Sequence, residues 1–323
     1  MASNGPDSGA PAPPPAPPPA PAAGAPVAIV TGANSGIGLA VCVALARAGY
    51  TVYGGMRATA SAAELLAAAA AAAVDPPGAV HVVRMDVGND RSVATAVAAV
   101  LAATGDRVDV AVANAGYGKR VTVEGVPLSD YQSMMNVNFF GALRLVQACV
   151  PSMRRRRSGR VLGVSSVIGL VAFPFFGAYA ASKFAMEGLW ESSHAEYKAL
   201  GVHFILMEPG PVATPMAHRP PGPWSPPDEL VPVWDAYAAQ FMAEFFSIAH
   251  TPDACADAFV RAVSDPAPAL RYMTHPPSEG MLRTKVADLD GKGVAATTLA
   301  LLATAKPGGG STPPPAEADR AEQ

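Results

Sequence analysis

The stretch "TGANSGIG", residues 31–38, stands between a β-branched run, "VAIVT" at 27–31, and a segment with helical spacing, "IGLAVCVALARAGY" at 37–50. This order is typical of a strand, a glycine turn and a helix. The glycines let the backbone turn sharply and approach a pyrophosphate, which then lies at the positive end of the helix. The stretch therefore predicts a dinucleotide site, with contacts from Gly32, Asn34, Ser35, Gly36, Ile37 and Gly38.

The same alternation continues along the chain. Further strands are predicted at 51–55, 79–87, 108–116, 160–166 and 202–210. One helix is predicted to end at about Ala73, and another to begin at about Asp90. A third is predicted to begin at a capping box formed by Ser129 and Gln132, and a fourth to span about 177–200. Strands that alternate with helices form a parallel sheet covered on both faces. We therefore expect an α/β fold, a doubly wound parallel sheet of about seven strands (Rossmann fold), in a single domain over 27–292.

The two ends and one internal segment depart from this pattern. Residues 1–26 are almost wholly Pro, Ala and Gly, and residues 306–323 have a similar composition. Such segments bury too little apolar surface to offset their ordering entropy, so we expect disordered tails. Residues 216–270 are rich in Pro and aromatic residues, and we expect them to form a lid or a wall of the substrate pocket.

Composition argues against several classes of function. The formal net charge is −3 with both signs interspersed, so we expect no nucleic-acid partner. The cysteines form no C-x-x-C pair and the histidines no H-E-x-x-H motif, which predicts neither a disulfide framework nor a metal site. The arginines at 154–157 are interpreted as cations that complement the C-terminal end of a helix.

The longest apolar window, residues 161–181, resembles a membrane span in length. Ser165, Ser166, Gly169 and Pro174 break it into a strand, a loop and a new helix, so we expect no transmembrane segment. The first residues have neither a basic region followed by an apolar run nor the arginines of a mitochondrial presequence. We therefore expect a cytoplasmic protein, with peripheral association with a membrane as an alternative.

The end of the second predicted strand bears on the choice of nicotinamide cofactor. An acidic residue at this position would bind the ribose 2′-hydroxyl of NAD. The strand instead ends in "YGGMR", residues 53–57, and Arg57 is placed to pair with a 2′-phosphate through its planar guanidinium. We therefore predict that NADP(H) is preferred over NAD(H).

Several motifs follow one another in a fixed order: T-G-x-x-x-G-x-G at 31–38, "NAG" at 114–116, a serine pair at 165–166 and Y-x-x-x-K from Tyr179 to Lys183. In this combination the chain resembles the short-chain dehydrogenase/reductase family over about residues 27–215. The resemblance implies a catalytic tetrad of Asn138, Ser166, Tyr179 and Lys183. Ser165 is the competing choice for the serine.

The resemblance also implies further cofactor contacts. These come from Asp86, Val87, Asn114, Ala115, Gly116, Tyr179, Lys183, Pro209, Gly210, Val212 and Thr214. Asp86 and Val87 would lie beside the adenine, Asn114 would brace the central strand, and Pro209 and Gly210 would turn beneath the nicotinamide, whose carboxamide would bind Thr214. One departure from the family is Ala113, where a second asparagine is common.

The chemistry explains why Tyr179 and Lys183 are needed at this spacing. Residues four apart share one face of a helix. A carbonyl that receives a hydride needs a proton, which a tyrosine can supply, but lowering the tyrosine pKa from about 10 to about 7 for the reverse reaction requires roughly 4 kcal/mol. We expect the Lys183 ammonium to supply this stabilisation and to reach the cofactor ribose. Ser166 would orient the substrate oxygen, and Asn138 would hold a water that connects Lys183 to solvent.

Within the family, segments such as "NAGYG" at 114–118 and "EPGPVATPM" at 208–216 look most like retinol dehydrogenases and 17β-hydroxysteroid dehydrogenases. This implies a bulky apolar carbonyl or alcohol as substrate, Tyr179 as general acid and base, and a homodimer or homotetramer. A 3-oxoacyl-type or other small-carbonyl reductase is the main alternative, and a non-catalytic NADPH-binding regulatory module is a distant one. A serine hydrolase is disfavoured, because "GVSSV" at 163–167 lacks the closing glycine of a nucleophile elbow.

Overall fold

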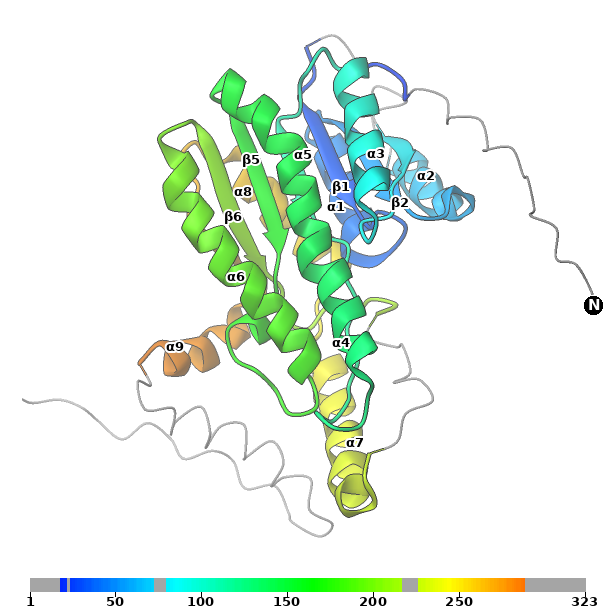
Figure 1. Cartoon of the computed structure of the whole chain (residues 1–323), viewed down its shortest axis with the longest axis vertical. Coiled ribbons are helices and arrows are strands. Elements are labelled where there is room, and N and C mark those ends of the chain that lie inside the picture. Colours follow the sequence, from blue (N-terminus) through cyan, green and yellow to red (C-terminus); the bar gives the residue numbers. More distant parts are fainter. Residues whose placement is uncertain (1–17, 22–23, 73–79, 217–225, 288–323) are drawn as a thin grey trace, which may run out of the picture.

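The computed structural model describes residues 18–21, 24–72, 80–216 and 226–287. Within them, seven parallel strands form one sheet in the order β3-β2-β1-β4-β5-β6-β7 (Figure 1). The strands are β1 (Val27–Thr31), β2 (Thr51–Met56), β3 (Val80–Arg84), β4 (Val110–Ala113), β5 (Gly159–Val164), β6 (Val202–Glu208) and β7 (Arg271–Met273). The strand order reverses between β1 and β4, and ligands of doubly wound sheets bind at the carboxyl ends beside such a reversal. The predicted fold class is confirmed.

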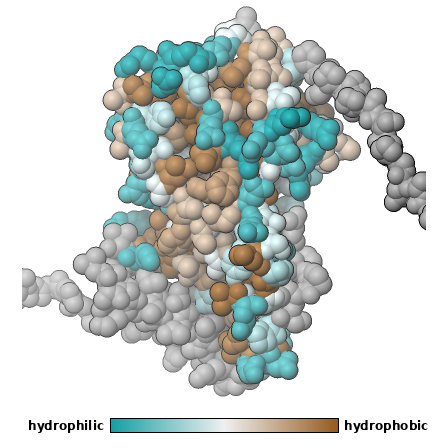
Figure 2. Space-filling model, viewed as in Figure 1, coloured by the Kyte–Doolittle hydropathy of each residue, from teal (hydrophilic) through white to brown (hydrophobic). Residues whose placement is uncertain are grey.

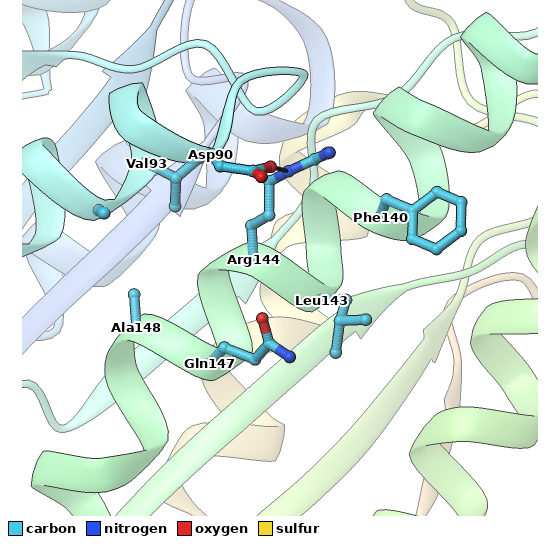
Figure 3. Close-up of a pocket in the computed structure, with 8 residues that line it drawn as sticks. Asp90, Val93, Phe140, Leu143, Arg144, Gln147 and Ala148 are labelled. Carbon is cyan, nitrogen blue, oxygen red and sulfur yellow. Dashed lines mark hydrogen bonds and ion pairs between the residues drawn. The ribbon is translucent and has the colours of Figure 1, made fainter.

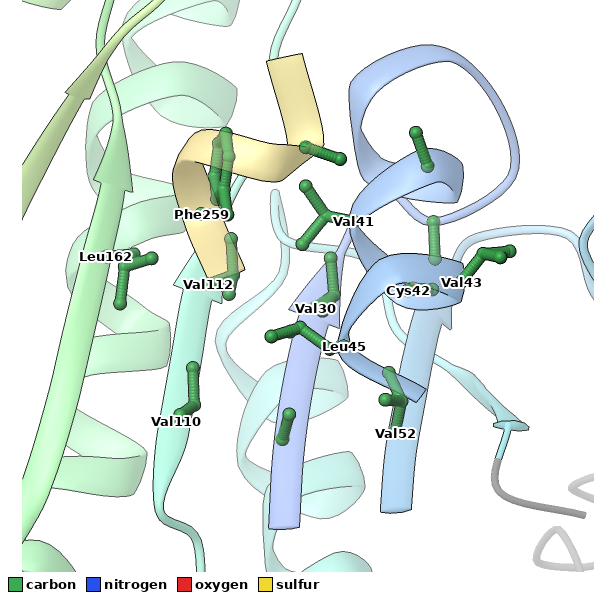
Figure 4. Close-up of a cluster of buried hydrophobic side chains, with 14 of the residues drawn as sticks. Val30, Val41, Cys42, Val43, Leu45, Val52, Val110, Val112, Leu162 and Phe259 are labelled. Atoms are coloured by element: carbon green, nitrogen blue, oxygen red, sulfur yellow. The ribbon is translucent and has the colours of Figure 1, made fainter. Parts of the chain in front are cut away.

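Helices cover both faces of the sheet because strand side chains alternate between the faces. Val30 and Val112 belong to a core with α1 (Gly36–Arg47), α2 (Ala62–Ala71) and α8 (Pro252–Ser264) (Figure 4). Ile29 and Ala111, their neighbours in sequence, belong to a second core with α3 (Asp90–Ala103), α5 (Gly141–Arg156) and α6 (Gly177–Lys198). Each continuous β-branched run of the sequence therefore contributes side chains to both hydrophobic cores, one on each face of the sheet.

The segment predicted as a lid contains two helices with different surroundings. α7 (Val231–Ile248) projects beyond the carboxyl edge of the sheet, whereas α8 packs beside α1 and buries Cys255 and Phe259 (Figures 1 and 4). Thr251 caps α8, and apolar residues follow at helical spacing. The part from 252 onward is therefore core, and the lid hypothesis is restricted to the region of α7. Residues 1–17, 22–23, 217–225 and 288–323, which include most of both predicted tails, lie outside the described residues.

The predicted capping box at Ser129 is wrong. α4 (Leu128–Met135) begins one residue earlier, with Pro127 in the N-cap position and no side-chain cap bond. The fixed φ of proline already directs the chain into the helix, so Ser129 falls inside the first turn. α4 continues through a π-helical turn, η2 (Asn136–Phe140), into α5, whose last turn carries Arg154, Arg155 and Arg156 as predicted.

Short elements complete the described chain. They are the 3₁₀ turns η1 (Thr59–Ser61), η3 (Val167–Gly169), η4 (Asp228–Leu230) and η5 (Pro276–Ser278), and the helix α9 (Glu279–Ala287). Among the helices described, none combines the length and the apolar character needed to cross a bilayer. The apolar window at 161–181 is divided among β5, η3 and the start of α6.

Candidate active site

The glycine turn between β1 and α1 is shaped by backbone that only glycine adopts readily. The angle φ is +67° at Gly32 and +55° at Gly36. A Cβ atom on Gly38 would lie 2.2 Å from the Gly32 carbonyl oxygen. Ser35, the N-cap residue of α1, makes no side-chain cap bond among the described residues, which leaves the first N–H groups of the helix for an anion. The turn therefore fits a dinucleotide phosphate.

Asn114 fastens this turn to the neighbouring strand. Its Nδ2 donates to the carbonyl oxygens of Thr31 at 2.8 Å and Gly32 at 3.2 Å. The Thr31 hydroxyl accepts from the backbone N–H groups of Asn114 and Ala115, both at 3.0 Å. Asn114 thus joins the ends of β1 and β4, the position the resemblance implies for it. Thr31, which completes the contact, is a residue that sequence reasoning missed.

The predicted adenine-side residues lie in a loop that is held by two side chains sequence reasoning also missed. Asp86 Oδ1 accepts from the Gly88 N–H at 3.0 Å, and Val87 is buried against the start of α5. Arg144 donates to the Val87 carbonyl at 3.0 Å and to Asn136 Oδ1 at 2.8 Å, and Asn136 Nδ2 donates to the Gly88 carbonyl at 3.1 Å. Arg144 and Asn136 therefore clamp the loop onto η2.

The chain after β6 returns to the glycine turn. A Cβ atom on Gly36 would lie 3.1 Å from Thr214 Cγ2, so this threonine sits against the start of α1. The Pro209 carbonyl accepts from the Val167 N–H at 3.0 Å, and Val212 pairs with His250. Gly210 leaves room for His275, since an added Cβ would lie 2.6 Å from His275 Cβ. The loop after β6 thus runs from the residues that follow β5 to the glycine turn before α1.

The remaining predicted cofactor contacts differ in exposure. Arg57 follows directly after β2 and is exposed, as is Asn34 in the glycine turn. Ile37 is partly buried and packs against the core beneath α1. Arg57 and Asn34 therefore have polar side chains free to meet a ligand, whereas Ile37 has a packing role as well.

The tetrad residues come together at the carboxyl edge of β4 and β5. Tyr179 and Lys183 lie one turn apart on α6 and are 8% and 3% exposed. The Lys183 ammonium donates to the Val164 carbonyl at 2.7 Å and lies 5.6 Å from the centre of the Tyr179 ring. The Ser166 hydroxyl accepts from the Ile168 N–H at 3.1 Å and lies near enough to Tyr179 to lower its pKa, whereas Ser165 lies beside Glu187. Ser166 is therefore the serine that the fold brings to the tyrosine.

Asn138 is fully buried in η2 and fixes the loop after β4. Its Oδ1 accepts from the Tyr117 N–H at 3.0 Å, and its Nδ2 donates to the Tyr117 carbonyl at 2.9 Å and to Ser182 Oγ at 2.9 Å. The amide is thus engaged with α6 and with the loop at once. This side chain positions the segment that carries Gly116 and Gly118, and Gly118 lies against the Tyr179 ring.

Burial sets the protonation of Tyr179 and Lys183. Burial raises the pKa of Tyr179 to about 12, and the hydrogen bond from Ser166 opposes this rise. Burial lowers the pKa of Lys183 to about 8, and the charge of Glu187 opposes this fall. At neutral pH the tyrosine is therefore a proton donor and the lysine a cation. The effect of burial exceeds that of Ser166, so the pKa of Tyr179 lies above its usual value instead of below it.

An aromatic cluster adjoins Tyr179 on the side of α7. Phe176 lies 6.5 Å from the Tyr179 ring and 5.3 Å from Phe241 of α7, measured between ring centres. Phe241 in turn stacks on Tyr237 at 5.6 Å and meets Phe173 at 6.5 Å. These rings give the edge of the site an apolar wall.

A separate hollow of about 480 Å³ lies between α3 and α5 (Figure 3). Phe140 and Leu143 line it, and Arg144 forms an ion pair with Asp90 at its rim. The hollow contains no member of the tetrad, so it is not part of the reacting centre. In the described part of the chain, no group of three His, Cys, Asp or Glu side chains is arranged to hold a metal ion.

Comparison with known proteins agrees with this geometry. The family model described as "short chain dehydrogenase" matches residues 26–221. Human 17-beta-hydroxysteroid dehydrogenase type 1 is 37% identical over 276 residues, which covers 82% of each chain. Retinol dehydrogenase 8 of Bos taurus is 35% identical over 285 residues, which covers 85% of this chain and 89% of the relative.

Solved structures with the same fold contain either nicotinamide cofactor. A short-chain dehydrogenase/reductase from Burkholderia phymatum in complex with NAD has a TM-score of 0.71 and 25% identity, covering 82% of this chain and 94% of the neighbour. An alcohol dehydrogenase from Thermococcus sibiricus complexed with 5-hydroxy-NADP has a TM-score of 0.62 and 28% identity, covering 77% and 95%. The fold therefore accommodates both cofactors, and the choice between them depends on particular side chains.

Proposed function

The chain belongs to the short-chain dehydrogenase/reductase family, and from this premise we propose that it transfers a hydride between NADP(H) and a carbonyl or alcohol group of a bulky apolar substrate. The observation that carries the proposal is the meeting of Ser166, Tyr179 and Lys183 at the carboxyl edge of the sheet, where the Lys183 ammonium lies near Gly116. A general acid, its hydrogen-bond partner and a buried cation beside a dinucleotide site are the groups that carbonyl reduction requires.

The chain's own residues supply the proton and the orientation. When bound, the cofactor supplies or accepts the hydride at the substrate carbon. Ser166 holds the substrate oxygen by a hydrogen bond. In the reducing direction Tyr179 donates its hydroxyl proton to that oxygen, and Lys183 stabilises the resulting phenolate until a solvent proton restores it. Burial raises the pKa of Tyr179, so its hydroxyl is protonated near neutral pH and can act as the donor when a carbonyl is reduced.

Arg57 supports the preference for NADP(H). It is exposed at the end of β2, where the ribose 2′ substituent lies in doubly wound folds. The last residues of β2 are uncharged, so no carboxylate on this strand end would repel a 2′-phosphate.

The aromatic wall supports an apolar substrate. Phe176 and Phe241 are partly exposed and extend away from Tyr179, and the buried Tyr237 ring packs behind Phe241. A 3-oxoacyl-type reductase would instead use a basic patch at the site mouth for a carrier protein. α7, the helix beside the site, contains Asp235 and Glu244 and no Lys or Arg.

A cofactor-dependent assay with a substrate panel tests the proposal. Purified protein is mixed with NADPH and with retinals, ketosteroids, 3-oxoacyl thioesters and small aldehydes, and the loss of nicotinamide absorbance is followed. We expect turnover of the bulky apolar carbonyls, and a fall of about 100-fold or more in Tyr179→Phe while NADPH still binds. Binding of NADPH without turnover on any member, in both proteins alike, would favour the regulatory module and reject the enzyme.

A further inference from the structure

We propose that Glu187 is a positioning residue for Lys183, held in place by Arg271 at the edge of the sheet. The proposal rests on the proposed function for its catalytic meaning, although its contacts stand independently. Tyr179, Lys183 and Glu187 succeed one another at intervals of four on α6, and Glu187 is only 5% exposed. A carboxylate one turn beyond the lysine therefore shares its buried face.

Lys183 and Glu187 converge on one glycine. A Cβ atom on Gly169, in η3, would lie 3.2 Å from Lys183 Cβ and 3.3 Å from Glu187 Cγ. The same Cβ would lie 2.4 Å from Ser165 Oγ, which faces the Glu187 carboxylate. The absence of a side chain at Gly169 thus lets the lysine, the glutamate and the serine pack against one another under the reacting centre.

Arg271 ties this cluster to two strands. It forms ion pairs with Glu187 and, at 2.7 Å, with Glu208, the last residue of β6. Glu208 is almost completely buried and precedes the Pro209–Gly210 turn. A third carboxylate, Glu191 on the next turn of α6, pairs with Arg271 at 2.7 Å from an exposed position. Arg271 therefore links the helix of the tetrad to the strand whose loop is expected to face the nicotinamide.

The charge that acts on Lys183 comes from the side of Glu187. Lys183 faces Tyr179 on its own helix, Val164 and Ser165 at the end of β5, and Asn138 from η2, and all four are uncharged at neutral pH. Glu187 is the charged group that raises the lysine pKa against the effect of burial. Burial also raises the pKa of Glu187 itself, and Arg271 opposes this rise. Arg271 thus favours the ionised form of Glu187, and the charge of Glu187 favours the protonated form of Lys183.

The test titrates Lys183 in the free, full-length protein. The chain has only six lysines, so ¹³C labelling at lysine Cε gives a spectrum in which Lys183→Met identifies the resonance. We expect Glu187→Gln to lower the titration midpoint of Lys183 by about half a pH unit or more, because the nearest opposite charge is removed. Glu191→Gln, the matched control, loses a carboxylate partner of the same arginine and should keep the midpoint of the unaltered protein. Equal midpoints in the two variants would overturn the proposal.

Two further measurements separate positioning from simple stability. Glu187→Asp keeps the charge one methylene further back, so we expect a smaller shift in the same direction, and this variant serves if Glu187→Gln does not fold. With a substrate found in the panel, Glu187→Gln should move the alkaline limb of kcat to lower pH and leave the KM of the carbonyl substrate unchanged. An effect on KM alone counts against the proposal. Failure of the panel would reject the enzymatic function while the titration still decides the role of Glu187.

Discussion

At the scale of single residues, burial determines which side chains of the site are protonated near neutral pH. Tyr179 and Lys183 are almost equally buried, yet burial moves their pKa values in opposite directions because it disfavours the charged form of each. The sequence predicts that the two side chains meet, since helical spacing is enough for that. It does not predict the partner of the ammonium, the Val164 carbonyl, because this contact depends on how α6 packs against β5.

These shifts predict opposite pH profiles for the two directions. Carbonyl reduction needs protonated Tyr179 and charged Lys183, so we expect kcat to stay flat between about pH 6 and 7.5 and to fall above about pH 8 as Lys183 loses its proton. Alcohol oxidation needs a proton acceptor, so its rate should rise with pH. Initial rates in both directions, at saturating cofactor and constant ionic strength, give the profiles. A reduction rate that declines below neutral pH would contradict these assignments.

A second prediction concerns Arg57. If its guanidinium pairs with the 2′-phosphate, Arg57→Ala should raise the KM for NADPH by about tenfold, since one exposed charge-assisted hydrogen bond contributes about 1.5 kcal/mol. The KM for NADH should not change, because NADH carries no phosphate at that position. Arg261→Ala, which removes an exposed arginine from α8, is the matched control. Parallel changes in both cofactor constants would mean that Arg57 does not select between them.

At the scale of elements, the glycine turn is the part of the site that the sequence predicts most completely. Gly38→Ala would bring a Cβ within 2.2 Å of the Gly32 carbonyl oxygen, so the first turn of α1 must move. We expect NADPH binding to weaken by about 100-fold or more and the free energy of unfolding to fall by about 1–3 kcal/mol. Gly188→Ala on α6 meets no atom within 4 Å and should stabilise the protein by about 0.5–1 kcal/mol. Fluorescence titration and denaturant unfolding of both variants provide the comparison.

Other elements of the site could not be predicted from local pattern. Arg144 looks like a solvated charge of an amphipathic helix, and its contacts with Val87 and Asn136 arise only when α5 crosses the loop after β3. Likewise the Pro and aromatic content of 216–270 hides the core helix α8, whose Thr251 cap and apolar spacing are visible only when that stretch is read separately. Side chains that act across elements escape sequence reasoning because their partners are distant along the chain.

The Arg144 clamp yields its own prediction. Arg144→Ala removes charged hydrogen bonds to two backbone carbonyls and to Asn136, so we expect a loss of about 1–3 kcal/mol in the free energy of unfolding. The KM for NADPH should rise, while kcat at saturating cofactor stays near that of the unaltered protein because the tetrad is untouched. Arg155 lies on the same helix as Arg144 and forms an exposed ion pair with Asp106. Arg155→Ala should therefore lower the free energy of unfolding by less than about 1 kcal/mol. Equal losses of stability in the two variants would argue against a clamp.

At the scale of the whole molecule, α5 and α6 lie side by side and form one broad face (Figure 1). Figure 2 shows hydrophobic side chains gathered over the middle of this face. Phe140, in η2 just before α5, is 45% exposed, and Phe184 of α6 is 39% exposed. A surface on which hydrophobic side chains gather is typical of protein interfaces. We propose that this face joins two copies of the chain, as the resemblance to the family implies.

Sedimentation velocity tests this proposal on the full-length protein. We expect the unaltered chain to sediment as a dimer or a tetramer, and Phe184→Glu to shift it toward the monomer, because burying a charge in an apolar interface is unfavourable. Val123→Glu is the matched control: its side chain is 85% exposed and lies in the loop before α4, so it should leave the distribution unchanged. Because Phe184 follows Lys183 directly on α6, loss of the interface should also loosen the helix that carries Tyr179 and Lys183. Phe184→Glu should then show a lower kcat that recovers at protein concentrations where the dimer re-forms, whereas a kcat independent of concentration would separate assembly from catalysis.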